Sequence, residues 1–126
     1  MSRLFVNGTL MRGLSLHQNL AGATCLGTFR TAAAYRVHSI ADIHPGMYRV
    51  EQGGYSIEGE LYEVPPDVLD RVVRSEPPGL YVGDIELDDG TMVPGILFSR
   101  HDAIRHPDIS HFGGWRAYIE SQTLSD

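Results

Sequence analysis

The sequence predicts a mixed α+β fold with a curved, barrel-like β-sheet of about six to seven strands and roughly two or three short flanking helices. Three observations predict it. Most expected strands follow one another directly instead of alternating with helices, 14 glycines suit a curved sheet, and 126 residues fit one domain with an ordinary core. We therefore expect residues 1–126 to form a single domain.

Apolar, β-branched and aromatic runs predict the strands of the first half. These strands are Arg3–Asn7, Thr24–Arg30, Ala34–Ile40 and Met47–Val50. Between the first two, Met11–Leu20 is compatible with a helix, but Gly13 interrupts it, so we expect a turn or two of helix at most. Pro45-Gly46 is expected to turn the chain before the fourth strand.

The clearest strand pattern is the alternation within Ser56–Val64. One face carries Ile57, Gly59 and Leu61, and the other carries Glu58, Glu60 and Tyr62. A period of two is typical of a strand with one buried and one solvent-facing side.

The second half begins with a helix signal. Asp67 follows two prolines and is suited to accept hydrogen bonds from first-turn amides. An apolar stripe follows at helical spacing, formed by Val68, Leu69, Val72 and Val73. Two extended runs, Leu80–Leu87 and Met92–Phe98, flank Asp88-Asp89-Gly90-Thr91 and predict a hairpin. The segment Gly114–Gln122 is expected to be helical, with Trp115, Tyr118 and Ile119 on one side.

Composition excludes several classes of function. The 10 basic residues are all arginine. Because Schiff-base chemistry, covalent pyridoxal phosphate and a Walker A loop each need a lysine, this chain cannot provide them. A net charge of -6 without a basic cluster argues against a nucleic-acid partner. We see neither an apolar run long enough for a membrane span nor a signal peptide, so we expect no membrane partner and a cytoplasmic location. Oligomeric state stays open.

Metal and cofactor signals are weak. The single Cys25 excludes an intramolecular disulfide, and its neighbours predict a buried, inert thiol more readily than a nucleophile. The six histidines lack the spacing of metal ligands, so no metal site is predicted. Because no dinucleotide or hydrolase motif is present, we expect no cofactor.

Three constellations are candidates for chemistry. Asn7-Gly8-Thr9-Leu10 follows the first strand, where successive amides can hold a carboxylate, although an Asn-Gly pair also makes simple tight turns. Glu76 stands where the predicted helix must end, before Pro77-Pro78, and is a candidate general acid/base; the alternative is a solvated carboxylate. His44, in the expected Pro45-Gly46 turn, either faces a pocket or lies on the surface.

The order of several motifs resembles the gamma-glutamylcyclotransferase-like family. The matching segments are Leu4–Gly13, Gly59–Val64 and Glu76–Tyr81. A closer resemblance, to the C-terminal domain of allophanate hydrolases and its free-standing bacterial relatives, extends to His106–Ser110 and Gly114–Tyr118. The resemblance implies a mixed barrel with flanking helices, in agreement with the strand pattern. It also implies an enzyme that acts without metal on a small carboxylate or amide substrate.

The resemblance implies roles for particular residues. Backbone amides of Asn7, Gly8, Thr9 and Leu10 would bind the substrate's carboxylate, and Glu76 would be the catalytic acid/base, giving 5-oxoproline from a gamma-glutamyl compound. Asn7 stands where the family has tyrosine, which separates this pocket from that of the cyclotransferases. Further substrate-binding candidates are Arg12, Arg36, His44 and Tyr81.

Two alternatives to the cyclotransferase remain open. In allophanate hydrolases the corresponding domain is credited with decarboxylating the product of the amidase domain, and such a step would depend on donors and cations such as Arg12, Arg36 and His44 as much as on Glu76. The second alternative is a small-molecule-binding domain without catalysis.

Overall fold

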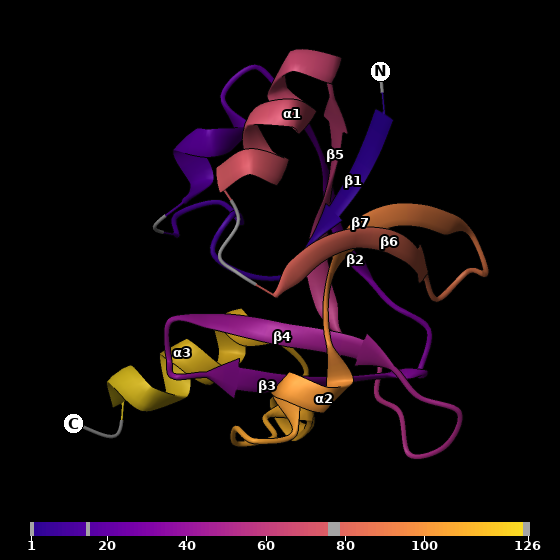
Figure 1. Cartoon of the computed structure of the whole chain (residues 1–126), viewed down its shortest axis with the longest axis vertical. Coiled ribbons are helices and arrows are strands. Elements are labelled where there is room, and N and C mark those ends of the chain that lie inside the picture. Colours follow the sequence, from indigo (N-terminus) through magenta and orange to yellow (C-terminus); the bar gives the residue numbers. More distant parts are fainter. Residues whose placement is uncertain (1, 15, 76–78, 125–126) are drawn as a thin grey trace.

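A five-stranded mixed sheet and a separate two-stranded hairpin carry the fold (Figure 1). The computed structural model describes residues 2–14, 16–75 and 79–124. In this part of the chain the strands are β1 (Ser2–Val6), β2 (Thr24–Arg30), β3 (Tyr35–Ile40), β4 (His44–Arg49), β5 (Glu58–Val64), β6 (Leu80–Glu86) and β7 (Met92–Phe98). The five-stranded sheet has the order β2-β5-β1-β7-β6, and β3 pairs with β4.

The first strand of the chain lies in the centre of the larger sheet. β1 runs antiparallel to β5 and parallel to β7, where Phe5 is opposite Gly95. The sheet is not closed, but an isolated bridge between Thr31 and Leu87, just beyond β2 and β6, joins its two edges. A bulge in β2, between Cys25 and Gly27, adds to the curvature. The predicted mixed α+β class and the barrel-like sheet are therefore confirmed.

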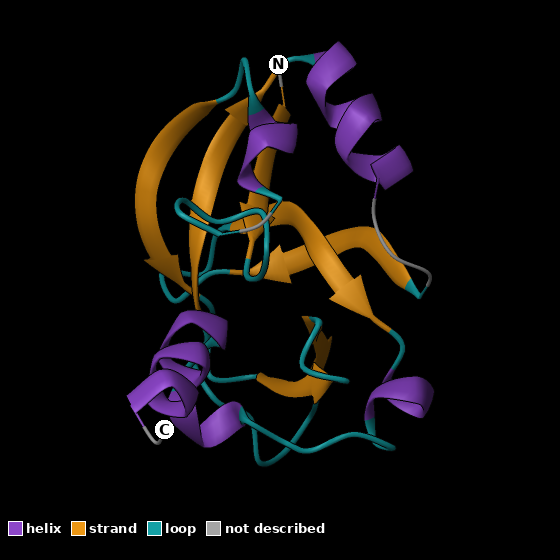
Figure 2. Cartoon of the chain, turned by 90° about the vertical axis from the view of Figure 1, so that its left-hand side faces the viewer, coloured by secondary structure: helices purple, strands orange, loops and turns teal. Residues whose placement is uncertain are grey.

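Short helices cover the two ends of the molecule (Figures 1 and 2). They are α1 (Pro66–Ser75), α2 (Arg100–Ala103), α3 (Trp115–Leu124) and the 3₁₀ turns η1 (His17–Leu20) and η2 (Ser110–Phe112). Pro66 occupies the first helical position of α1, where a missing amide hydrogen is harmless. The helix buries Val68 and Val72 but leaves Val73 exposed. At the other end, Trp115 and Tyr118 anchor α3 in the core.

The β3–β4 hairpin lies below the larger sheet in the view of Figure 1, beside α2 and α3. Its turn is formed by Ala41 and Asp42, both with positive φ (54° and 58°). The Asp42 carboxylate accepts hydrogen bonds from Ser39 and from Tyr118 of α3. These bonds fasten the turn to the C-terminal helix, and the strand that follows it begins at His44.

Several sequence expectations were wrong in detail. Pro45-Gly46 is not a turn but lies inside β4, because the chain reverses earlier, at residues 41–42. The second face of β5 is not solvent-facing, since Glu60 and Tyr62 are buried. Cys25 is half-buried instead of buried, because β2 is an edge strand. Within the described part of Met11–Leu20 only η1 forms, and α2 and η2 were not predicted.

Candidate functional site

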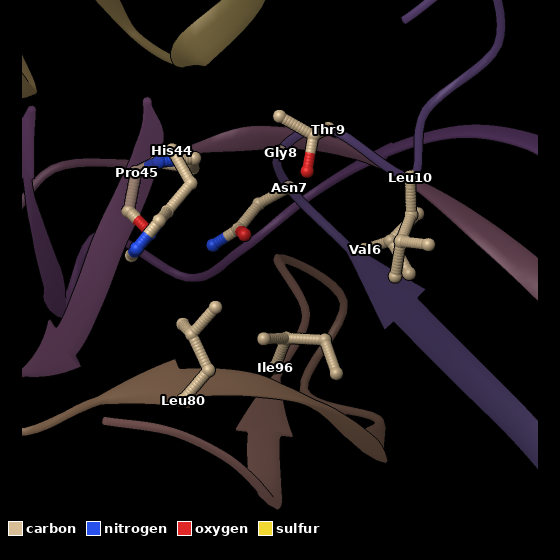
Figure 3. Close-up of a pocket in the computed structure, with 9 residues that line it drawn as sticks. All are labelled: Val6, Asn7, Gly8, Thr9, Leu10, His44, Pro45, Leu80 and Ile96. Carbon is tan, nitrogen blue, oxygen red and sulfur yellow. The ribbon is translucent and has the colours of Figure 1, made fainter. Parts of the chain in front are cut away.

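A small pocket opens where β1 ends (Figure 3). About 20 Å³ of it is open to the centre of a water molecule, and it lies between the Asn7–Leu10 loop, the start of β4 and strands β6 and β7. The lining residues are Val6, Asn7, Gly8, Thr9, Leu10, His44, Pro45, Leu80 and Ile96. A cavity needs roughly 10–15 Å³ of such space to hold one water molecule, so a ligand larger than a water must move the side chains around the pocket.

The Asn7–Leu10 loop is a tight structure held by its own backbone. The Met11 amide donates to the Gly8 carbonyl at 3.0 Å, and the Leu16 amide donates to the Thr9 carbonyl at 2.9 Å. Among the described residues, no acceptor pairs with the backbone amides of Thr9 and Leu10. Such amides at a turn are suited to hold an anionic oxygen.

Asn7 is a buried polar side chain in this pocket, with 5% of its surface exposed. Its amide nitrogen lies 3.1 Å from the sulfur of Met47 on β4, a weak acceptor. In Figure 3 its amide group points into the space between His44 and Leu80. Asn7 can therefore turn a donor and an acceptor toward a small ligand.

His44 is buried beside the loop, with 6% of its surface exposed. Its Nδ1 lies 2.9 Å from the carbonyl oxygen of Pro45, which can only accept, so Nδ1 carries a hydrogen. The ring packs edge-on against Phe98. This leaves Nε2 as the ring nitrogen that can exchange a proton with a ligand.

Polar and apolar groups line different sides of the pocket (Figure 3). The loop and His44 supply its hydrogen-bonding groups, while Leu80 and Ile96 form an apolar side. His44 is the one ionisable side chain among the described lining residues. Together these residues supply hydrogen-bond donors suited to a carboxylate, an imidazole that can exchange a proton, and an apolar side.

The structure thus brings together five of the residues that the sequence singled out, namely Asn7, Gly8, Thr9, Leu10 and His44. Their roles as ligand contacts remain predictions. Pro45, Leu80 and Ile96 also line the pocket, and sequence reasoning missed them. No local signal marks them, because they reach the site through the pairing of distant strands.

Other predicted residues lie elsewhere. Arg12 turns its guanidinium toward Glu60, with 3.3 Å between Nε and Oε2. Arg36, on β3, pairs with Asp108 at 2.8 Å and stacks on Tyr55. Tyr81, on β6, is about half exposed. The structure does not place these three side chains in the pocket, and Glu76 lies outside the described residues.

Metal-binding clusters and membrane-spanning helices are both absent from residues 2–14, 16–75 and 79–124. Within these ranges, no three His, Cys, Asp or Glu side chains gather in a way that would hold a metal ion. The buried His38 has protein partners for both ring nitrogens: Nδ1 lies 2.9 Å from the His106 carbonyl and Nε2 lies 2.9 Å from the Tyr48 hydroxyl. None of the described helices is long and apolar enough to cross a membrane.

Comparison with known proteins gives consistent matches. Residues 2–120 match the protein family described as "Allophanate hydrolase C-terminal domain". The urea amidolyase of Saccharomyces cerevisiae is 33% identical over 127 residues, which cover 94% of this chain and 7% of the yeast protein. The chain therefore spans only a small part of the length of this curated relative.

Solved structures resemble most of the chain. The uropathogenic E. coli-specific protein c4763 is 41% identical with a TM-score of 0.90, covering 94% of this chain and 95% of that one. Allophanate hydrolase of Kluyveromyces lactis is 31% identical with a TM-score of 0.87, covering 95% of this chain and 21% of that one. An AIG2-like protein from Mus musculus, 21% identical with a TM-score of 0.64 over 86% of this chain and 85% of that one, shares the fold.

Proposed function

The chain belongs to the allophanate hydrolase C-terminal domain family, and from this premise we propose that it is an enzyme that decarboxylates a small N-carboxylated, urea-type compound in the pocket beside the Asn7–Leu10 loop. One observation carries the proposal: a single small pocket combines amide donors, a buried histidine and an apolar side. The substrate class is N-carboxycarbamate, which has two carboxylates on one nitrogen and arises when an amidase removes ammonia from allophanate.

The first requirement of the reaction is tight binding of the carboxylate that is not released as carbon dioxide. Amides of Thr9 and Leu10, with the side chain of Asn7, are suited to this task because they are fixed donors at the end of a buried strand. The other carboxylate then lies toward Leu80 and Ile96. A carboxylate against hydrocarbon is poorly solvated, which favours its conversion to neutral carbon dioxide.

The second requirement is a proton for the nitrogen. When the bond between nitrogen and the departing carboxyl carbon breaks, its electron pair stays on nitrogen, which takes one proton. The dianion plus that proton gives carbamate and carbon dioxide, so atoms and charge balance. His44 is the proton donor in this scheme, since Nδ1–H is held by Pro45 and Nε2 can carry the transferred proton.

An amidase-coupled assay tests this function. Allophanate and a separate amidase generate N-carboxycarbamate in place, and carbon dioxide release is followed with and without this protein. We expect release faster than the spontaneous rate, a loss of at least about tenfold in His44→Gln, and normal folding of that variant. A rate of carbon dioxide release that does not change with protein concentration would show that the protein does not catalyse the decarboxylation.

A second candidate function uses the same pocket. In a gamma-glutamylcyclotransferase, the Asn7–Leu10 loop would hold the α-carboxylate while Glu76 moves the proton, and 5-oxoproline would be released. The loop at the end of β1 is the observation that favours it. A panel of gamma-glutamyl amines and peptides separates the two, because 5-oxoproline formation that disappears in Glu76→Gln would identify the cyclotransferase.

A further inference from the structure

Glu60 is a buried carboxylate that the reaction scheme above does not use. It lies on β5, and 5% of its side chain is exposed. Oε1 accepts hydrogen bonds from the Arg12 amide at 2.8 Å and from the Tyr62 hydroxyl at 2.9 Å. Oε2 lies 3.3 Å from Arg12 Nε and 3.4 Å from Arg116 Nη2. A buried charge is tolerated when it is paired in this way.

These contacts fix both ends of the segment 7–11, which contains the Asn7–Leu10 loop of the pocket. In the sheet, Glu60 stands opposite Val6, the last residue of β1. Its side chain then reaches the backbone of Arg12, so one residue holds both ends of the segment 7–11. Arg116 of α3 adds a second hold, because its Nη2 donates to the Arg12 carbonyl at 2.7 Å. Both backbone polar groups of Arg12 are thus bound by side chains from other elements.

We propose that Glu60 is a positioning residue: its carboxylate fixes the Asn7–Leu10 loop by accepting the Arg12 amide, and it touches no ligand itself. Glu60 is absent from the residues that line the pocket, which separates its role from that of Asn7 or His44. The inference rests on the proposed function in one respect, namely that the Asn7–Leu10 loop binds the ligand's carboxylate.

Two conservative variants of Glu60 separate the effect of its side-chain length from the effect of its charge. Glu60→Asp keeps the charge but is one methylene too short to hold the Arg12 amide from the same strand position. Glu60→Gln loses the charge but keeps a side-chain oxygen at the same length. Arg12→Gln serves as the matched control, because it removes the ion pair and leaves the backbone amide that Glu60 binds.

The readouts are malonate affinity and amide hydrogen exchange of residues 8–12. Malonate carries two carboxylates on one carbon, so it is a stable mimic of the proposed substrate. We expect Glu60→Asp to weaken malonate binding about tenfold or more and to speed loop exchange by a similar factor. Glu60→Gln and Arg12→Gln should both stay within about threefold of wild type, because both keep a side-chain oxygen that can accept the Arg12 amide.

Other outcomes are equally informative. Near wild-type affinity and exchange in a folded Glu60→Asp would overturn the inference, as would equal damage in Glu60→Gln and Arg12→Gln, since that pattern belongs to a stabilising ion pair. If malonate does not bind the wild-type protein, the proposed function fails. Loop exchange then still decides the role of Glu60, because it needs no ligand.

Discussion

The ring of Pro45 lies directly against the backbone of Gly8. A Cβ built on Gly8 would come within 2.6 Å of Pro45 Cδ, closer than real side chains approach. The contact joins the end of β1 to the start of β4, and both residues line the pocket. The position of the β3–β4 hairpin, and with it that of His44, therefore depends on the absence of a side chain at residue 8.

Gly8→Ala tests this contact. The added methyl must push the hairpin away from the loop, so we expect a loss of about 1–3 kcal/mol in the free energy of unfolding and malonate binding at least about tenfold weaker. Chemical denaturation and a malonate titration measure the two effects. Gly90→Asn is the control, because Gly90 has open space around it and a left-handed φ of 88° that asparagine tolerates. Wild-type behaviour of Gly8→Ala would contradict the packing argument.

Arg36→Gln separates stability from binding. Arg36 holds Asp108 and the Gly53 carbonyl and does not line the pocket, so it ties β3 to the C-terminal segment. We expect a loss of about 1 kcal/mol in unfolding free energy and malonate affinity within about twofold of wild type. The exposed Tyr81→Phe should change neither quantity. Strong loss of malonate binding in Arg36→Gln, without unfolding, would instead place Arg36 at the site.

Thr31 offers a test of the junction between the sheet edges. This residue is fully buried, and its hydroxyl oxygen accepts the Ile57 amide at 2.9 Å while donating to the Ala32 carbonyl. Thr31→Val leaves that amide without its acceptor and should lower the free energy of unfolding by about 1–3 kcal/mol. Thr31→Ser keeps the hydroxyl and should lose less. Fluorescence of Trp115, the single tryptophan, follows unfolding because the ring is buried. Equal losses of unfolding free energy in Thr31→Val and Thr31→Ser would exclude the hydrogen bond as the cause.

Two carboxylates, the buried Glu60 and the half-buried Asp108, predict acid sensitivity. Burial raises the pKa of Glu60, but hydrogen bonds from the Arg12 amide, Tyr62 and the Arg12 side chain outweigh it, so the pKa is lowered. The pKa of Asp108 is lowered in the same way, by Ser110 and Arg36 against burial. A lowered folded pKa gives stability that is present above the ordinary values of 4.5 and 3.8 and is lost as the pH falls through the folded values.

We therefore expect the melting temperature to be nearly constant from neutral pH to about 5 and to fall at lower pH. Glu60→Gln should be less stable at neutral pH and should lose less on acidification, because it has no carboxylate to protonate. Asp70→Asn is a suitable control, since Asp70 forms an exposed ion pair with Arg74. Identical acid profiles of wild type and Glu60→Gln would show that Glu60 does not contribute.

Local patterns predicted most elements because their signals are local. Strands β2 and β7 begin and end where the sequence indicates, and the Asp88–Thr91 turn forms as expected, with Gly90 at positive φ. The hairpin β3–β4 was misread because proline and glycine usually mark turns, whereas here Gly46 accommodates Phe98, which lies 2.9 Å from the position of a Cβ. The real turn uses Ala41, a residue that rarely adopts positive φ.

The candidate site was predictable in part. The Asn7–Leu10 loop and His44 were singled out by residue type, and they do lie together. The burial of Glu60 was not predictable, because its partners Arg12 and Arg116 are 48 and 56 residues away and alternation in β5 places it on a solvent face. The apolar side of the pocket likewise depends on the parallel pairing of β1 with β7, for which no local pattern exists.

The central place of β1 has a consequence for how the protein folds. Its neighbours are β5 and β7, so the first strand made must wait for segments near the middle and the end of the chain before it is paired on both sides. Contacts between such distant segments slow folding, since loop-closure entropy is lost before they form. The Asn7–Leu10 loop follows β1 directly, and its pocket includes Ile96 of β7. During synthesis, the pocket can therefore be completed only after the β6–β7 hairpin has emerged.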